Sequence, residues 1–150
     1  MRLRDWLDSG DLQQQPPTAE EIGRLLEIAD RDLKDAMASG ISVDRRFAIA
    51  YEAALTLSVA ALRAAGYRTR GSSSSHHWLT FALLPELMAE QVESRSRYFQ
   101  LCRRKRHRVA YERAGLATET ELSELMGEVK AFRCELVTWL REAHANLAPL

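Results

Sequence analysis

Apolar residues recur at intervals of three and four along most of the chain, which is the spacing of amphipathic helices. The first such run follows Thr18, a good N-cap residue, and Glu21 three positions later completes a predicted capping box. Ser39 and Gly40 mark its predicted end. The apolar face of this helix consists of Ile22, Leu25, Leu26, Ala29 and Leu33.

A second helix is predicted between Ser42, its N-cap, and Gly66, its C-terminal stop. Eight alanines fall between positions 48 and 65, and small side chains let another helix approach closely. The larger apolar side chains of this helix are Phe47, Tyr51, Leu55 and Leu62.

Residues 67–75, YRTRGSSSS, predict a loop whose serine run is mobile. A short helix is expected over residues 76–84, and Pro85 suits the first turn of the next helix, which extends to about Arg113 with room for a break. After Gly115, Thr118 and Glu121 predict a second capping box. The long last helix carries Leu122, Leu125, Met126, Val129, Phe132, Leu136, Val137 and Leu140 on one side.

These elements predict an all-α bundle of four or five helices, because neither a strand pattern nor an internal repeat is evident. The bundle is expected over residues 18–150, after an N-terminal arm, residues 1–17, which Trp6 would anchor. A length of 150 residues fits one domain. The shares of hydrophobic (46%) and charged (28%) residues argue against intrinsic disorder.

The sequence predicts a cytoplasmic protein, because it shows neither an apolar signal-peptide region nor an uninterrupted apolar membrane span. Cys102 and Cys134 lack CxxC spacing and are expected to be reduced. No cofactor is predicted, since Walker and Rossmann motifs are absent. His76 and His77 are adjacent and would point in different directions, so capping or surface roles are favoured over a metal site.

Charge is distributed unevenly along a chain that has 21 basic and 21 acidic residues. The segment 95–108, RSRYFQLCRRKRHR, holds seven of the basic residues and no acid. The rest of the chain therefore has 14 basic against 21 acidic residues, a formal charge of −7. A basic pole of this kind attracts phosphate, nucleic acid or an acidic partner.

Two arginines interrupt the apolar stripe of the helix that contains this segment. Arg95 and Arg106 project onto the same face as Met88, Val92, Phe99, Cys102 and Val109. A guanidinium there is costly unless it meets an anion. Two interpretations of Arg106 stay open: it reaches the rim and pairs with an acid, or it lines a cleft or subunit interface and binds phosphate.

His107 and Tyr111 are four residues apart, so their side chains should be neighbours, and Arg104 joins their face. Like charges around His107 should disfavour its protonated form, which would leave a neutral imidazole able to accept a proton. The alternative is that His107 is a solvated surface residue.

The basic run also has two interpretations. It could be a solvated face balanced by Glu119, Glu121, Glu124 and Glu128 on the last helix. Alternatively, the aromatic residues Tyr98 and Phe99 among the arginines would be compatible with stacking on unpaired bases.

The run from Arg103 to Glu112, RRKRHRVAYE, resembles the signature region of HEPN domains, which are helical bundles of this size. The family motif is an arginine, a polar residue, three to five further residues and a histidine near the end of a late helix. Arg106 matches the arginine and His107 the polar residue, whereas Tyr111 stands at the position of the closing histidine. The resemblance extends loosely over residues 18–147.

The resemblance implies a homodimer that binds RNA or nucleotide phosphate, and either cleaves RNA without a metal or has lost that activity. Arg106 would hold the scissile phosphate, while His107 and Tyr111 would be the other catalytic candidates. Tyrosine is a weak base at pH 7, so Tyr111 is a poor substitute for histidine. The basic neighbours that would contact RNA are Arg103, Arg104, Lys105 and Arg108.

Many HEPN proteins belong to toxin–antitoxin or defence operons, often beside a nucleotidyltransferase. Such a partner is implied by the resemblance alone. The alternative function is an inactive interaction module whose basic helix binds an acidic protein, such as a nucleotidyltransferase antitoxin.

Overall fold

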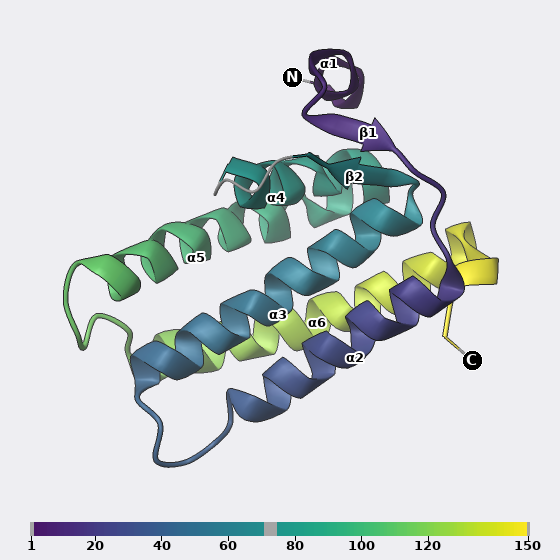
Figure 1. The fold of residues 1–150 in the computed structure, drawn as a ribbon. Coiled ribbons are helices and arrows are strands. Elements are labelled where there is room, and N and C mark those ends of the chain that lie inside the picture. The colour runs from purple at the N-terminus through teal and green to yellow at the C-terminus, as the bar shows by residue number, and fades with distance from the viewer. Residues whose placement is uncertain (1, 71–74, 150) are drawn as a thin grey trace.

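The computed structural model describes residues 2–70 and 75–149 as a helical bundle with a small two-stranded sheet (Figure 1). The prediction of a helical bundle is confirmed, but the described residues form six α-helices rather than four or five, because the N-terminal arm contains α1. The serine run at 71–74 lies outside the described residues. The elements are α1 (Leu3–Ser9), β1 (Leu12–Gln14), α2 (Ala19–Asp35), α3 (Val43–Ala64), β2 (Tyr67–Thr69), α4 (Ser75–Met88), the 3₁₀ turn η1 (Glu90–Val92), α5 (Glu93–Tyr111), α6 (Glu119–Ala143) and the 3₁₀ turn η2 (Ala145–Leu147).

Helix α3 crosses the middle of the bundle and contacts α2, α4, α5 and α6 (Figure 1). Its alanines make this arrangement possible, because small side chains let several helices approach one axis. Most of the surface of α3 is buried, including five alanines that are wholly enclosed. Those residues are Ala50, Ala53, Ala54, Ala60 and Ala61.

The predicted starts of three helices are confirmed, whereas the first of them ends at Asp35 and not at the predicted Ser39 and Gly40. Thr18, Ser42 and Thr118 each accept a hydrogen bond from the backbone N–H three residues later. The capping box is complete at Thr118, where Glu121 also accepts from the backbone. At Thr18 no return bond from Glu21 is seen, because the Glu21 carboxylate instead binds Arg63 on α3.

The prediction that strands are absent is wrong. β1 pairs antiparallel with β2, with Leu12 opposite Thr69. Strands of three residues are too short to show the alternation by which strands are recognised in a sequence. Leu12 is buried in a second apolar cluster, and the Trp6 ring contacts Trp78 edge-on at 5.9 Å between centroids. The predicted anchoring of the arm by Trp6 is thereby confirmed.

Pro85 does not begin a helix but lies inside α4, so that part of the sequence prediction is wrong. Proline cannot donate to the carbonyl four residues earlier, which here belongs to Phe81. The buried Ser96 hydroxyl of α5 donates to that carbonyl instead, at 2.6 Å. Helix α4 ends later, just before Ala89, whose φ is +104°.

By length and composition alone α3 would also qualify as a membrane-spanning helix. Most of that stretch is buried inside the bundle, and core helices of soluble proteins meet the same criterion. The absence of a membrane span and the cytoplasmic location therefore stay predictions.

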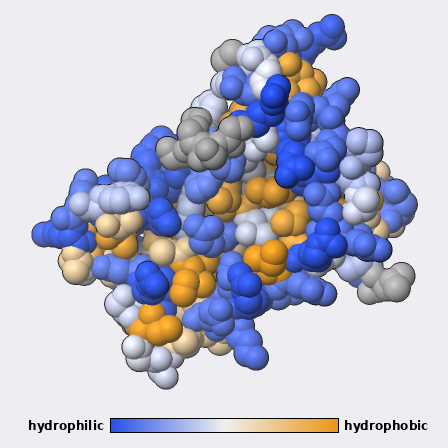
Figure 2. Space-filling model, viewed as in Figure 1, coloured by the Kyte–Doolittle hydropathy of each residue, from blue (hydrophilic) through white to orange (hydrophobic). Residues whose placement is uncertain are grey.

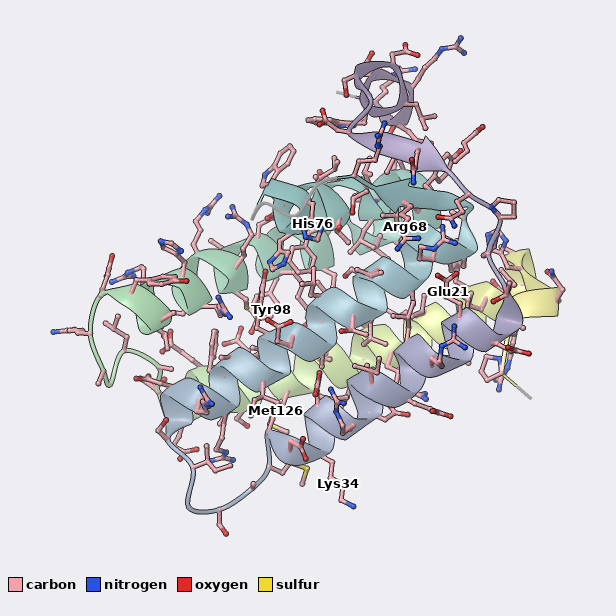
Figure 3. All side chains as sticks on the ribbon, viewed as in Figure 1. Glu21, Lys34, Arg68, His76, Tyr98 and Met126 are labelled. Carbon is pink, nitrogen blue, oxygen red and sulfur yellow. The ribbon has the colours of Figure 1, made fainter. Side chains whose placement is uncertain are left out.

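The surface seen in Figure 2 is mostly hydrophilic and is interrupted by apolar patches over α2 and α3. Figure 3 shows nitrogen-tipped side chains projecting from α5 on the same side of the molecule. The basic pole expected from the sequence is therefore carried by α5, at the edge of the bundle.

Candidate functional site

A cleft of about 550 Å³ lies where α5 faces α3 and α4. Helix α5 supplies most of its walls, while α3 and α4 contribute one side chain each. Four arginines, two histidines and two tyrosines line it, so nearly every side chain can donate a hydrogen bond. They are Tyr51, His77, Arg103, Arg104, Arg106, His107, Arg108 and Tyr111.

Helix α5 brings together six of the seven residues predicted for the site. Arg103 donates to Gln100 at 2.9 Å, Arg108 pairs with Glu112 at 3.2 Å, and Arg104 is exposed. The His107 and Tyr111 rings lie 4.8 Å apart, so the predicted neighbourhood of these two residues is confirmed.

Lys105 does not belong to the cleft lining. Its ammonium pairs with Glu121 of α6 at 3.2 Å, because it lies on the side of α5 that faces that helix. Lys105 therefore lies outside the cleft, and its contact with phosphate stays a prediction. The acids of the last helix do balance part of the basic run, as one interpretation predicted.

The aromatic residues of the basic segment also differ from expectation. Phe99 is 0% exposed and packs between Phe81 and Phe132, so it cannot stack on a base. Tyr98 is half-buried, and burial raises its pKa. Cys102 is a free thiol, as predicted, and burial raises its pKa to about 12.

Arg95 and Arg106 share one stripe of α5 but have different surroundings. Both terminal nitrogens of Arg95 meet carboxylates of α6, from Glu128 and from Glu135 at 2.6 Å. The side chain of Arg106 is 35% exposed and has one carboxylate nearby, Glu52, whose oxygen lies 3.7 Å away. That separation is too long for a hydrogen bond.

The Nε atoms of Arg95 and Arg106 are both buried without a hydrogen-bond partner among the described residues, so the two arginines differ in the partners of their terminal nitrogens. Both open interpretations of Arg106 therefore hold in part, since it lies near an acid and lines a cleft. Burial raises the pKa of Glu52, Arg106 opposes this effect, and Asp32 adds to it. The Arg106–Glu52 pair is thus loose, and its carboxylate is partly desolvated.

Tyr51 and His77 are cleft residues that the sequence did not indicate. The Tyr51 hydroxyl lies 3.3 Å from Nδ1 of His77, which links α3 to the start of α4. Tyr51 is 1% exposed, and burial raises its pKa. His77 is half-buried rather than a surface residue, and its neighbour His76 instead meets Thr69 at 3.3 Å.

Burial is the main cause of a lowered pKa at His77, and the positive charges of His76, Arg106 and Arg103 add to it. Both His77 and His107 line the cleft with the arginines, and His77 is the one that burial encloses. No spacing in the sequence relates Tyr51 to His77, because they lie on separate helices. The one available signal was a tyrosine on an otherwise apolar helix face.

Within residues 2–70 and 75–149, no three His, Cys, Asp or Glu side chains gather as metal ligands would. Comparisons of the chain with protein-family models, curated proteins and solved structures find no match. The HEPN resemblance therefore depends on the ten residues of the motif and on the helical architecture.

Proposed function

We propose that the cleft binds single-stranded RNA through its phosphates, with Arg106 as the central contact. The observation that carries this proposal is the Arg106 guanidinium, which lines the cleft, is 35% exposed and has the Glu52 carboxylate 3.7 Å from its terminal nitrogen. A guanidinium presents a planar fork of donors that matches the oxygens of a phosphate. Arg106 therefore retains hydrogen-bonding capacity that a phosphate could use.

The charge of the cleft supports a polyanionic ligand. Four arginines line it, and their carboxylate partners in the described part of the chain are Glu52 and Glu112. The remaining positive charge attracts a phosphate chain more strongly than a single small anion.

Exposed rings at the rim favour RNA over a purely acidic protein. Tyr111 is 73% exposed and lies against His107, so both rings are available for stacking on unpaired bases. The HEPN resemblance points to the same ligand class and extends the proposal to metal-independent cleavage. The homodimer and the nucleotidyltransferase partner are proposals that derive from the resemblance alone.

The test is binding of a fluorescein-labelled single-stranded RNA, measured by anisotropy at several salt concentrations. Arg106→Ala should weaken binding at least tenfold, which corresponds to about 1.4 kcal/mol. Arg97→Ala is the matched control, because Arg97 is exposed on the same helix, pairs with Glu93 and lies outside the cleft. This control should change affinity less than threefold.

Binding should weaken steeply as salt rises, and the slope should be smaller for Arg106→Ala because one phosphate contact is lost. Equal losses in both variants would mean that the cleft has no special role. Absence of RNA affinity at low salt, together with tight binding of an acidic polypeptide, would replace the proposal with the interaction-module alternative.

A further inference from the structure

We propose that His77, a residue outside the HEPN-like motif, is the base that accepts the proton of a ribose 2′-hydroxyl in this cleft, and that Tyr51 positions it. This inference rests on the proposed function, because it requires RNA in the cleft. It assigns the proton transfer to α4 and α3 rather than to the motif residues on α5.

The position of His77 suits this role better than the positions of the motif candidates. It lies in the first turns of α4, lines the cleft and is half-buried. His107 is exposed and Tyr111 is 73% exposed, whereas His77 is half-buried and its Nδ1 lies 3.3 Å from the Tyr51 hydroxyl, so His77 is the more firmly positioned of the three.

Tyr51 determines which nitrogen of His77 is available to a ligand. Its hydroxyl lies 3.3 Å from Nδ1, so Nε2 is the ring nitrogen left for RNA. Burial keeps the Tyr51 phenol protonated and neutral at neutral pH. When Nδ1–H donates to the Tyr51 oxygen, Nε2 has a free lone pair and can accept a proton.

Burial, and after it the positive charges around His77, lowers the pKa of His77 and so disfavours its protonated form before the reaction. The groups that face it are Tyr51 from α3, Arg103 and Arg106 from α5, and His76 from α4 itself. Arg103 and Arg106 are positively charged and His76 can become so, and these charges disfavour the protonated form of His77 before the reaction. A phosphate bound by Arg106 would offset this repulsion and make proton acceptance easier.

The reaction is an internal transfer at phosphorus. Nε2 of His77 takes the proton of the 2′-hydroxyl, the 2′ oxygen forms a bond to phosphorus, and the bond from phosphorus to the 5′ oxygen breaks. Water protonates the leaving 5′ oxygen, and the resulting hydroxide takes the proton back from His77. The products are a 2′,3′-cyclic phosphate and a 5′-hydroxyl end, and the step needs neither an oxidant nor a reductant.

The experiment follows cleavage of an end-labelled single-stranded RNA in EDTA by the full-length protein. The substrate control is an oligonucleotide of the same base sequence in which every ribose is replaced by 2′-deoxyribose, so that the attacking 2′-hydroxyl is missing. The proteins are the wild type, His77→Gln, Tyr51→Phe and His107→Gln. His144→Gln is the matched histidine control, because His144 packs on Trp139 at the far end of α6. RNA affinity is measured for every protein by anisotropy.

The expected result is cyclic-phosphate ends from RNA and none from the deoxy substrate. His77→Gln should slow cleavage at least 100-fold, as loss of a general base does, with affinity changed less than threefold. Tyr51→Phe should keep a measurable rate and move the acidic limb of the pH–rate profile, whereas His144→Gln should match the wild type. Retained RNA affinity shows that each variant is folded.

Three results would overturn the inference while leaving RNA binding intact. These are wild-type protein that binds RNA without cleaving it, His77→Gln that cleaves like the wild type, and loss of cleavage confined to His107→Gln. Wild-type protein that does not bind RNA would overturn the proposed function itself.

Discussion

Arg63 is buried and Arg106 is half-buried, and of the two only Arg63 has protein partners for its whole guanidinium. Arg63 is 5% exposed and donates five hydrogen bonds. Arg106 has one carboxylate beyond hydrogen-bond distance and an unpartnered Nε. A buried guanidinium without partners costs free energy, so the first arginine stabilises the fold and the second keeps capacity for a ligand.

The partners of Arg63 join segments that are far apart in the chain. Its guanidinium binds both oxygens of Glu21 on α2, at 2.9 and 3.1 Å, and the carbonyls of Gln15, Pro16 and Tyr67. Figure 3 shows Glu21 and the neighbouring Arg68 at the end of the bundle where α2 begins. The Arg63 guanidinium also lowers the pKa of Glu21. This one side chain therefore ties the N-terminal arm, α2 and β2 to α3.

The largest effect on stability is expected for Arg63→Ala. It leaves three backbone carbonyls and the Glu21 carboxylate without their shared donor, and breaking a buried pair costs about 3–5 kcal/mol of unfolding free energy. Urea unfolding followed by circular dichroism measures this loss. Arg24→Ala, an exposed change on α2, should alter stability by less than about 0.5 kcal/mol. A similarly small loss of stability in Arg63→Ala would show that Arg63 does not stabilise the fold.

Ser96→Ala should have the next largest effect, because it leaves the Phe81 carbonyl without its donor opposite Pro85. An unsatisfied buried acceptor costs about 1–3 kcal/mol. In a Pro85→Ala background the new backbone N–H can reach Phe81, so the cost of Ser96→Ala should fall by at least half. Equal costs in the two backgrounds would show that the serine does not substitute for the missing helix bond.

Arg106→Ala should leave stability nearly unchanged but weaken RNA binding, whereas Arg63→Ala mainly reduces stability. Its unfolding free energy should stay within about 0.5 kcal/mol of the wild type, since the Glu52 pair is loose and partly exposed. Its RNA affinity should nevertheless fall at least tenfold, as measured by anisotropy. A loss of stability comparable to that of Arg63→Ala would make Arg106 a structural residue and remove the contrast.

Glu52→Gln should change RNA affinity in the direction opposite to Arg106→Ala. Removing the carboxylate beside Arg106 removes a competitor for phosphate, so RNA affinity should rise about threefold to tenfold, or about 0.7–1.4 kcal/mol. Glu93→Gln is the control, because Glu93 pairs with Arg97 outside the cleft. Unchanged or weaker binding in Glu52→Gln would show that this carboxylate orients Arg106 rather than competing for it.

The smallest effect is expected in the pH dependence of stability. Because the pKa of His77 is lowered in the folded state, the unfolded state binds more protons at pH values below about 6.5. The contribution of His77 to the free energy of unfolding is therefore fully present above that pH, and it decreases as pH falls toward the pKa of His77 in the folded state. His77→Gln should flatten the unfolding free energy between pH 7 and 5, and an unchanged slope would contradict the lowered pKa.

Local signals predicted the helices well. Thr18, Ser42 and Thr118 cap the helices that they were expected to cap, and Gly66 ends α3 with a φ of +94°. The mid-stripe position of Arg106 also identified a residue that lines the cleft. Each of these features depends on neighbours within one or two helical turns, which are visible in the sequence.

Contacts between distant segments could not be predicted in this way. The pairing of β1 with β2, the bond from Ser96 of α5 to the Phe81 carbonyl of α4, and the proximity of Tyr51 to His77 all join separate elements. Their partners lie 15 to 57 residues apart in the chain, and no sequence period relates them.

The sequence by itself determined where the helices after Thr18, Ser42 and Thr118 begin, which faces are apolar, and that positive charge collects on one late helix. Only the tertiary structure decided which arginines would be neutralised. Arg63 and Arg95 lie opposite carboxylates of neighbouring helices, whereas the carboxylate beside Arg106 lies beyond hydrogen-bond distance. Whether a guanidinium is satisfied depends on donor–acceptor distances of a few ångströms, and helix packing determines those distances.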